Sequence, residues 1–169
     1  MKIVITGPEC SGKSTLTNAL AAIEGTGIME ELSRTYLESL VRPYNVDDII
    51  RIAHKHVEQE DILTKQHPLL ILDTDLITLE IWTEEKFGVV PEYISDQVRS
   101  RIYDHYLLCS PDFPWEYDPL RENPDDRDRL FNLYYSKLIE LNKKFTVLEG
   151  SHEQRLRRST KIIKSLKKG

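Results

Sequence analysis

A glycine-bounded stretch near the N-terminus has the residue types and spacing of a loop that binds phosphate. Residues 7–15 read GPECSGKST, and they fill the pattern G-x-x-x-x-G-K-[ST] with Gly7, Gly12, Lys13 and Ser14. Glycines allow successive backbone N–H groups to point inward around a polyphosphate, where a Cβ atom would clash. The lysine ammonium can then reach the β and γ oxygens, and the serine hydroxyl can bind Mg²⁺. The pattern therefore predicts a nucleotide site.

The segments on either side of this loop provide the setting that phosphate binding requires. Residues 2–6 are an apolar run that predicts a short buried strand, and residues 14–23 have the periodicity of a helix. The N-terminal end of that helix would add the positive end of its dipole to the site. We expect nucleotide contacts from Gly7, Pro8, Glu9, Cys10, Ser11, Gly12, Lys13, Ser14 and Thr15.

The rest of the chain alternates apolar runs with helical patterns. Further strands are predicted at residues 28–29, 69–73, 106–109 and in the FTVLEG run at 145–150. Helices are predicted at residues 31–40, 46–66 and 76–87, after Pro91, from Asn123-Pro124, and from the S-x-x-Q capping box at 151–154. This alternation predicts an α/β fold in one domain over residues 1–169, a P-loop NTPase three-layer sandwich. Its five-stranded parallel sheet would have helices on both faces and a lid loop at about 110–129.

The carboxyl ends of parallel strands meet at one edge of the sheet, so polar residues at these ends should lie together. Asp73 ends a buried apolar strand, as a Walker B acid does, and could hold Mg²⁺ opposite Ser14. Alternatively, Asp73 caps the following helix. Asp75 has two open interpretations, the helix cap or a catalytic residue that faces the substrate. Thr74 stands where AAA+ motors carry a glutamate, which disfavours a motor.

A kinase also needs groups that reach the transferred phosphate and the acceptor. Arg121 lies in the predicted lid and is a candidate catalytic residue; the alternative is a solvated surface loop. Glu30 or Glu31 could accept the proton of an acceptor hydroxyl, and Arg34 could bind substrate or form a surface ion pair.

Two tryptophans and the basic C-terminal segment allow further interpretations. Trp115, in the lid, could stack on a flat base of the substrate or hold the loop down as a hydrophobic latch. Trp82 has apolar neighbours and is interpreted as a core residue. The segment from Arg155 onward carries seven basic and no acidic residues. It could be solvated, place Arg155 or Arg158 over adenine, or contact a nucleic acid or membrane.

Four motifs together carry a resemblance to a known family. GPECSGKSTL, EELSRTYL, ILDTDLITLEIW and PWEYDPLR occur in the order found in the ribosylnicotinamide kinase domain of NadR-type NAD-biosynthesis proteins and in related stand-alone ATPases. The chain resembles that family over nearly its whole length. The resemblance implies ATP and Mg²⁺ as cofactors, with phosphate transfer to the 5′-hydroxyl of a nucleoside such as ribosylnicotinamide. It also implies roles for Glu31 and Arg34 in E-x-x-R, for Asp73 and Asp75 in D-T-D, and for Trp115, Asp118, Leu120 and Arg121 in the lid.

Composition narrows the class of protein further. The 169 residues carry a net charge of −5, which argues against a nucleic-acid partner. No apolar run has membrane-spanning length, and the two cysteines, Cys10 and Cys109, form no framework, so we expect a cytoplasmic protein with a small-molecule partner. Regulatory GTPases are disfavoured because D-x-x-G and N-K-x-D motifs are lacking. Two hypotheses remain: an ATP-dependent small-molecule kinase, and a regulatory ATPase without a small-molecule acceptor. The sequence does not indicate the oligomeric state.

Overall fold

A five-stranded parallel sheet forms the centre of the protein, whose computed structural model describes residues 1–117 and 125–168. The spatial order of the strands is β2-β3-β1-β4-β5, so the first strand is central. From β1 the chain goes to the edge strand β2, returns to β3 beside β1, and then crosses to β4 and β5 on the other side. The strands are β1 (Lys2–Thr6), β2 (Gly27–Met29), β3 (Leu70–Asp73), β4 (His105–Cys109) and β5 (Phe145–Leu148). The predicted fold class is confirmed.

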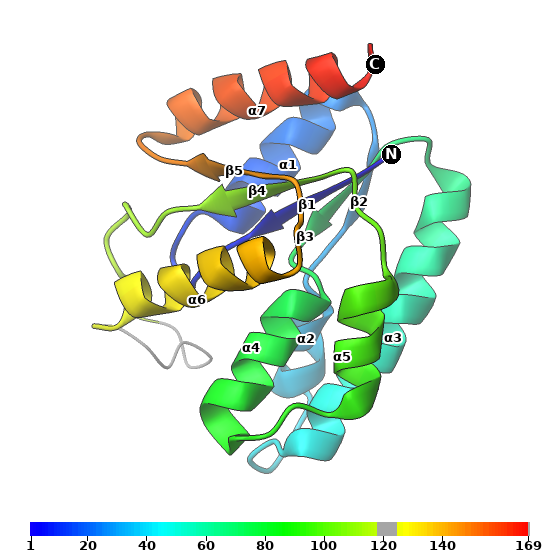
Figure 1. Cartoon of the computed structure of the whole chain (residues 1–169), viewed down its shortest axis with the longest axis vertical. Helices are drawn as coiled ribbons and strands as arrows, with labels where there is room; N and C mark the ends of the chain where they lie inside the picture. The colour runs from blue at the N-terminus through cyan, green and yellow to red at the C-terminus, as the bar shows by residue number, and fades with distance from the viewer. Residues whose placement is uncertain (118–124, 169) are drawn as a thin grey trace.

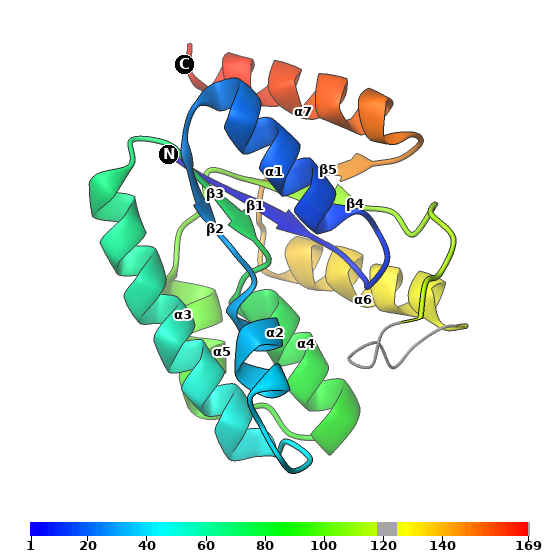
Figure 2. The same cartoon turned by 180° about the vertical axis from the view of Figure 1, so that it is seen from behind.

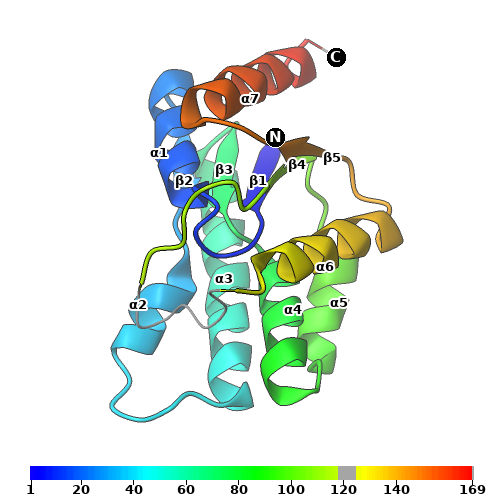
Figure 3. The ribbon, with the colours of Figure 1, turned by 90° about the vertical axis from the view of Figure 1, so that its left-hand side faces the viewer.

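Helices cover both faces of this sheet, as the edge-on view in Figure 3 shows. They are α1 (Lys13–Glu24), α2 (Leu32–Glu38), α3 (Val46–Gln66), α4 (Leu76–Phe87), α5 (Glu92–Ser100), α6 (Arg127–Glu140) and α7 (His152–Leu166). Helices α1 and α7 lie together on one face, and α3 to α6 lie on the other (Figures 1 and 2). No helix within the described ranges has the length and hydropathy needed to span a membrane.

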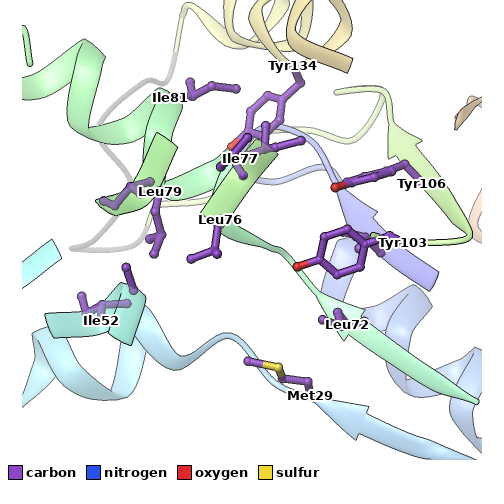
Figure 4. Close-up of a cluster of buried hydrophobic side chains, with 14 of the residues drawn as sticks. Met29, Ile52, Leu72, Leu76, Ile77, Leu79, Ile81, Tyr103, Tyr106 and Tyr134 are labelled. Carbon is purple, nitrogen blue, oxygen red and sulfur yellow. The ribbon is translucent and has the colours of Figure 1, made fainter. Parts of the chain in front are cut away.

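Alternation along the strands divides the core into two parts, because successive side chains of a strand point to opposite faces. Ile3 and Ile5 of β1 pack with α1 and α7 in one cluster. Val4 of the same strand packs with Leu72 and Tyr106 in the larger cluster under α3 to α6. Figure 4 shows part of this larger cluster, with Tyr103 and Tyr106 side by side. Burial on both faces explains why the central strands are continuous apolar runs.

Capping residues define the ends of several helices. Asn45 and Asp48 form a capping box at the start of α3, and Ser151 and Gln154 form the predicted one at the start of α7. Gly88 ends α4 in the left-handed conformation, with φ of 67°. The bounds predicted for α3 and α4 match those observed.

The predicted lid needs a correction at its C-terminal end. Helix α6 begins at Arg127, so Arg127 and Arg129 belong to a helix rather than to the loop. The described part of the loop comprises residues 110–117 and 125–126. Arg121 and the predicted helix start at Asn123-Pro124 lie outside the described residues.

Candidate active site

The phosphate loop joins β1 to α1 at the carboxyl edge of the sheet, and its glycines are needed where the chain crowds its neighbours. Gly7 has φ of 135°, and a Cβ there would lie 2.5 Å from the carbonyl oxygen of Cys109. Gly12 has φ of 77° and is the N-terminal cap of α1, where a Cβ would lie 2.9 Å from the ring of Phe113. A side chain at either position would therefore displace the loop.

Two side chains of the loop converge on a single carbonyl oxygen. The Nζ atom of Lys13 donates to the oxygen of Pro8 at 2.8 Å, and the hydroxyl of Ser11 donates to the same oxygen at 2.7 Å. The bond from Lys13 holds its ammonium group over the phosphate loop. A phosphate oxygen could replace Pro8 as its acceptor.

One cavity of about 290 Å³ runs from this loop to three helices. All nine residues from Gly7 to Thr15 line it, which is the placement expected of nucleotide contacts. The opposite walls come from the segment around α2, from β3–α4 and from α6. These walls contain Glu31, Ser33, Arg34, Leu37, Thr74, Thr78, Ile81, Trp82, Glu85, Leu130 and Tyr134.

Asp73 has the surroundings of a group that helps to hold a cation. It is 5% exposed, and its Oδ1 atom has no hydrogen-bond partner among the described residues. Burial raises the pKa of its carboxyl, whereas the charge of Lys13 and a hydrogen bond with Ser14 lower it. A buried carboxylate oxygen beside a serine hydroxyl suits Mg²⁺, which binds few protein ligands and keeps water and phosphate oxygens. The described residues contain no cluster of three or more acidic, His or Cys side chains that could hold a metal.

Of the two candidate glutamates, Glu31 lies on the cavity and Glu30 is exposed outside its described lining. The carboxylate of Glu31 accepts a hydrogen bond of 2.6 Å from the hydroxyl of Ser33. Arg34 also lines the cavity, and it forms an ion pair of 3.4 Å with Glu38, one turn further along α2. Glu31 and Arg34 are therefore both placed to reach a bound molecule.

Asp75 does not face the cavity, so the interpretation as a substrate-facing residue must be corrected. It is 2% exposed at the N-terminal cap position of α4, and the hydroxyl of Tyr106 donates to its Oδ2 at 2.8 Å. Burial raises the pKa of its carboxyl to about 7. Of the two acids in D-T-D, the structure directs Asp73 towards the phosphate loop and Asp75 into the core.

Arg155 also differs from its predicted role, since the described lining of the cavity does not include it. Its buried guanidinium donates to the carbonyl oxygens of Ser11, Ser110 and Gly150 and to the carboxylate of Asp112. All of its nitrogens are thus occupied by protein atoms, and the geometry leaves no face of the side chain for adenine.

The loop after β4 lies against the phosphate loop. The indole Nε1 of Trp115 donates to the carboxylate of Glu9 at 3.5 Å, and the sulfur of Cys10 accepts from the backbone N–H of Glu116 at 3.3 Å. Trp115 lies outside the described cavity lining. These contacts match the latch interpretation of Trp115 better than base stacking.

The structure adds an aromatic wall that the sequence interpretation missed. Trp82 packs against the larger core cluster, as expected, and it also lines the cavity, with the ring of Tyr44 at 5.2 Å between centroids. Tyr134 of α6 is both buried and part of the lining. A sequence signal existed, because Thr78, Trp82 and Glu85 recur at helical spacing in α4 after Asp73.

Comparison with known proteins identifies the class to which this fold and site belong. A family model described as an AAA domain matches residues 2–155, so the chain belongs to that family of P-loop domains. The description names a type of domain and not a motor activity. The chain is 28% identical over 172 residues to the trifunctional NAD biosynthesis/regulator protein NadR of Salmonella typhimurium, and equally to that of Escherichia coli. The match covers 97% of this chain and 42% of the length of each relative.

Solved structures agree with this fold. A NadR protein in complex with NR superposes with a TM-score of 0.73 at 19% identity, over 89% of this chain and 44% of that one. Deoxyadenosine kinase from M. mycoides gives a TM-score of 0.71 at 16% identity, over 98% of this chain and 100% of that one. The resemblance to the NadR-type kinase domain that the motifs indicated is therefore confirmed.

Proposed function

We propose that this chain is an ATP-dependent kinase that transfers the γ-phosphate of ATP to a hydroxyl group of a small nucleoside-like acceptor, with ribosylnicotinamide the favoured candidate. The observation that carries the proposal is the continuity of the cavity. One space is bounded at one end by the phosphate loop and at the other by Glu31, Arg34 and an aromatic wall. A kinase needs both ends in one water-excluding site, because donor and acceptor must meet in line.

The far end of the cavity suits a flat ring that carries a sugar. Trp82 and Tyr134 offer aromatic surface for stacking, with Leu37 and Ile81 beside them. Thr78, Glu31 and Arg34 supply polar groups on the same walls, which could bind the hydroxyls of a ribose. This mixture of aromatic and polar groups favours a nucleoside over a fatty or a purely ionic acceptor.

The candidate site residues would have the following roles in the proposed transfer. Lys13 would neutralise charge on the β and γ oxygens, and the loop amides would hold the polyphosphate. Glu31 would accept the proton of the acceptor hydroxyl. The oxygen of that hydroxyl would bond to the γ-phosphorus, and ADP would leave with the bridging oxygen. Asp73 and Ser14 would hold Mg²⁺, which supplies charge neutralisation between the phosphates when bound. Arg121, outside the described residues, is proposed to add a positive charge.

Relatives support this choice of activity. NadR proteins are named for NAD biosynthesis, one of the solved structures contains NR, and another NadR structure contains NAD and AMP-PNP. The other neighbours include a deoxyadenosine kinase and a thymidylate kinase. We further propose a cytoplasmic location, since Cys10 and Cys109 are both free thiols.

The test is a phosphate-transfer assay on the purified protein with Mg-ATP and a panel of nucleosides that includes nicotinamide riboside. Acceptor-dependent release of ADP, together with a phosphorylated nucleoside detected by mass spectrometry, is the expected result. A slow release of ADP that is the same with every acceptor would instead support the regulatory ATPase. The variant Glu31→Gln is the matched control, because it should lose acceptor-dependent turnover and keep nucleotide binding.

A further inference from the structure

We propose that Arg155 is a positioning residue of the phosphate loop, which orients the loop amides toward the phosphates by holding the opposite side of the same peptide groups. This inference rests on the proposed nucleotide site and goes beyond it. It assigns a function to a buried arginine that belongs to α7, far along the chain from the phosphate loop.

The geometry around Arg155 is unusually complete for a single side chain. It is 2% exposed, and its guanidinium donates to Ser11 O at 2.7 Å, Ser110 O at 2.9 Å and Gly150 O at 3.0 Å. The carboxylate of Asp112 lies 2.8 Å from Nη2 and balances the charge. The ring of Phe113 lies under the guanidinium, 4.6 Å from Cζ to the centroid, and the same ring lies against Gly12. One arginine therefore connects the phosphate loop, the segment after β4 and the turn after β5.

The bond to Ser11 has a direct consequence for the amide that follows it. The carbonyl of Ser11 and the N–H of Gly12 belong to one planar trans peptide, so they point in opposite directions. Arg155 lies outside the described cavity lining and holds the carbonyl on its own side, whereas Gly12 lines the cavity. Anchoring the oxygen outside thus directs the Gly12 N–H inward. The positive guanidinium also polarises the peptide, which strengthens that N–H as a donor to an anion.

A second arginine repeats the arrangement one peptide earlier. Nη1 of Arg127, at the start of α6, makes a long contact of 3.5 Å to the carbonyl of Cys10 and donates to the carbonyl of Phe113 at 2.8 Å. The peptide of Cys10 ends in the N–H of Ser11, which is the neighbouring candidate donor to phosphate. Cys10 itself has φ of 54°, a conformation that needs support from its surroundings. Two arginines from α6 and α7 would therefore support two successive loop amides.

The decisive experiment compares nucleotides that differ in their number of phosphates. Isothermal titration calorimetry would measure the dissociation constants of ADP and AMP for the wild type and for Arg155→Met, Arg127→Met and Arg157→Met. The last variant is the matched control, because Arg157 lies on the same helix, is exposed and pairs only with Glu153 among its described ion pairs. Thermal unfolding of each variant would be recorded in parallel.

The ratio of the ADP and AMP constants separates positioning from a structural role, because partial unfolding weakens both apparent affinities equally. For Arg155→Met we expect ADP to bind about tenfold more weakly while AMP changes little, as for the loss of one charge-assisted hydrogen bond. Arg127→Met should shift the ratio in the same direction by about threefold, since its contact to the loop is longer. Arg157→Met should keep the wild-type ratio.

Two results would overturn the inference. A folded Arg155→Met protein with the wild-type ratio would show that the guanidinium does not orient the amides. If Arg155→Met does not fold, Arg127→Met provides the test. An ADP to AMP ratio of dissociation constants that is unchanged in Arg127→Met would then overturn the inference. Absence of ADP and ATP binding in the wild type is a separate outcome, because it would remove the proposed nucleotide site itself.

Discussion

Replacing Asp75 by asparagine tests directly which of the two acids in D-T-D belongs to the chemistry. The side chain is buried between the end of β3 and α4, and Tyr106 donates to it at 2.8 Å. Burial raises the pKa of its carboxyl from 3.8 to about 7, because the interior disfavours the charged form. Glu60 also raises this pKa, and Lys143 lowers it. Asparagine has nearly the same shape and cannot ionise.

The sign of the effect follows from when the proton is bound. Between pH 3.8 and about 7 the unfolded chain has lost this proton and the folded protein keeps it. Rising pH therefore destabilises the wild type over that interval. The variant Asp75→Asn lacks this pH dependence, because asparagine does not ionise. At 1.36 kcal/mol per pH unit, the stability of the variant relative to the wild type should rise by about 2 kcal/mol between pH 5 and pH 7, and by only a few tenths of a kcal/mol more up to pH 8.

Urea unfolding of both proteins at pH 5, 6, 7 and 8 would measure this difference. All other titrating groups are shared by the two proteins, so subtraction isolates Asp75. Kinase activity of Asp75→Asn at pH 7 provides the second reading, and we expect it to stay close to that of the wild type.

Two observations would contradict this reasoning. A stability difference that does not vary from pH 5 to pH 8 would mean that the carboxyl is ionised in the folded protein, and hence not held in an apolar site. Loss of turnover with unchanged stability would mean that Asp75 reaches the substrate.

Substitutions at four further positions test the proposed site. Lys13→Ala should lower kcat/KM by roughly 100-fold or more, because it removes charge stabilisation of the transition state, and steady-state kinetics would show this. Asp73→Asn should raise the Mg²⁺ concentration needed for half-maximal activity; a wild-type dependence on Mg²⁺ would rule out its role as Walker B acid. Trp82→Ala should raise KM for the acceptor about tenfold with KM for ATP unchanged. Trp82→Phe keeps an aromatic ring, so its KM for the acceptor should lie close to that of the wild type. Arg121→Ala should lower kcat while calorimetry shows ATP binding largely intact; weakened ATP binding would instead make it a ground-state contact.

The sequence alone predicted the features that depend on residues close together in the chain. The phosphate loop follows from glycines and a lysine at fixed spacing, since only residues 7–12 connect the strand to the helix. The capping box at Ser151 and the ends of α3 and α4 depend equally on local hydrogen bonds. Strands that alternate with helices implied a parallel sheet, and thereby the edge at which the site lies.

Side-chain direction depended on contacts between distant segments, and there the local pattern was ambiguous. Asp73 and Asp75 are two residues apart, yet one meets the phosphate loop and the other meets Tyr106 of β4. The apolar neighbours of Trp82 in the sequence predicted a core position. Only the packing of α2 and α6 opposite this residue shows that it also lines a cavity. Arg155 could be assigned only once α7 was packed beside the phosphate loop, because its partners lie up to 144 residues away in the chain. Spacing along a chain restricts which groups can be neighbours locally, whereas burial and long-range packing determine which of them share the cavity.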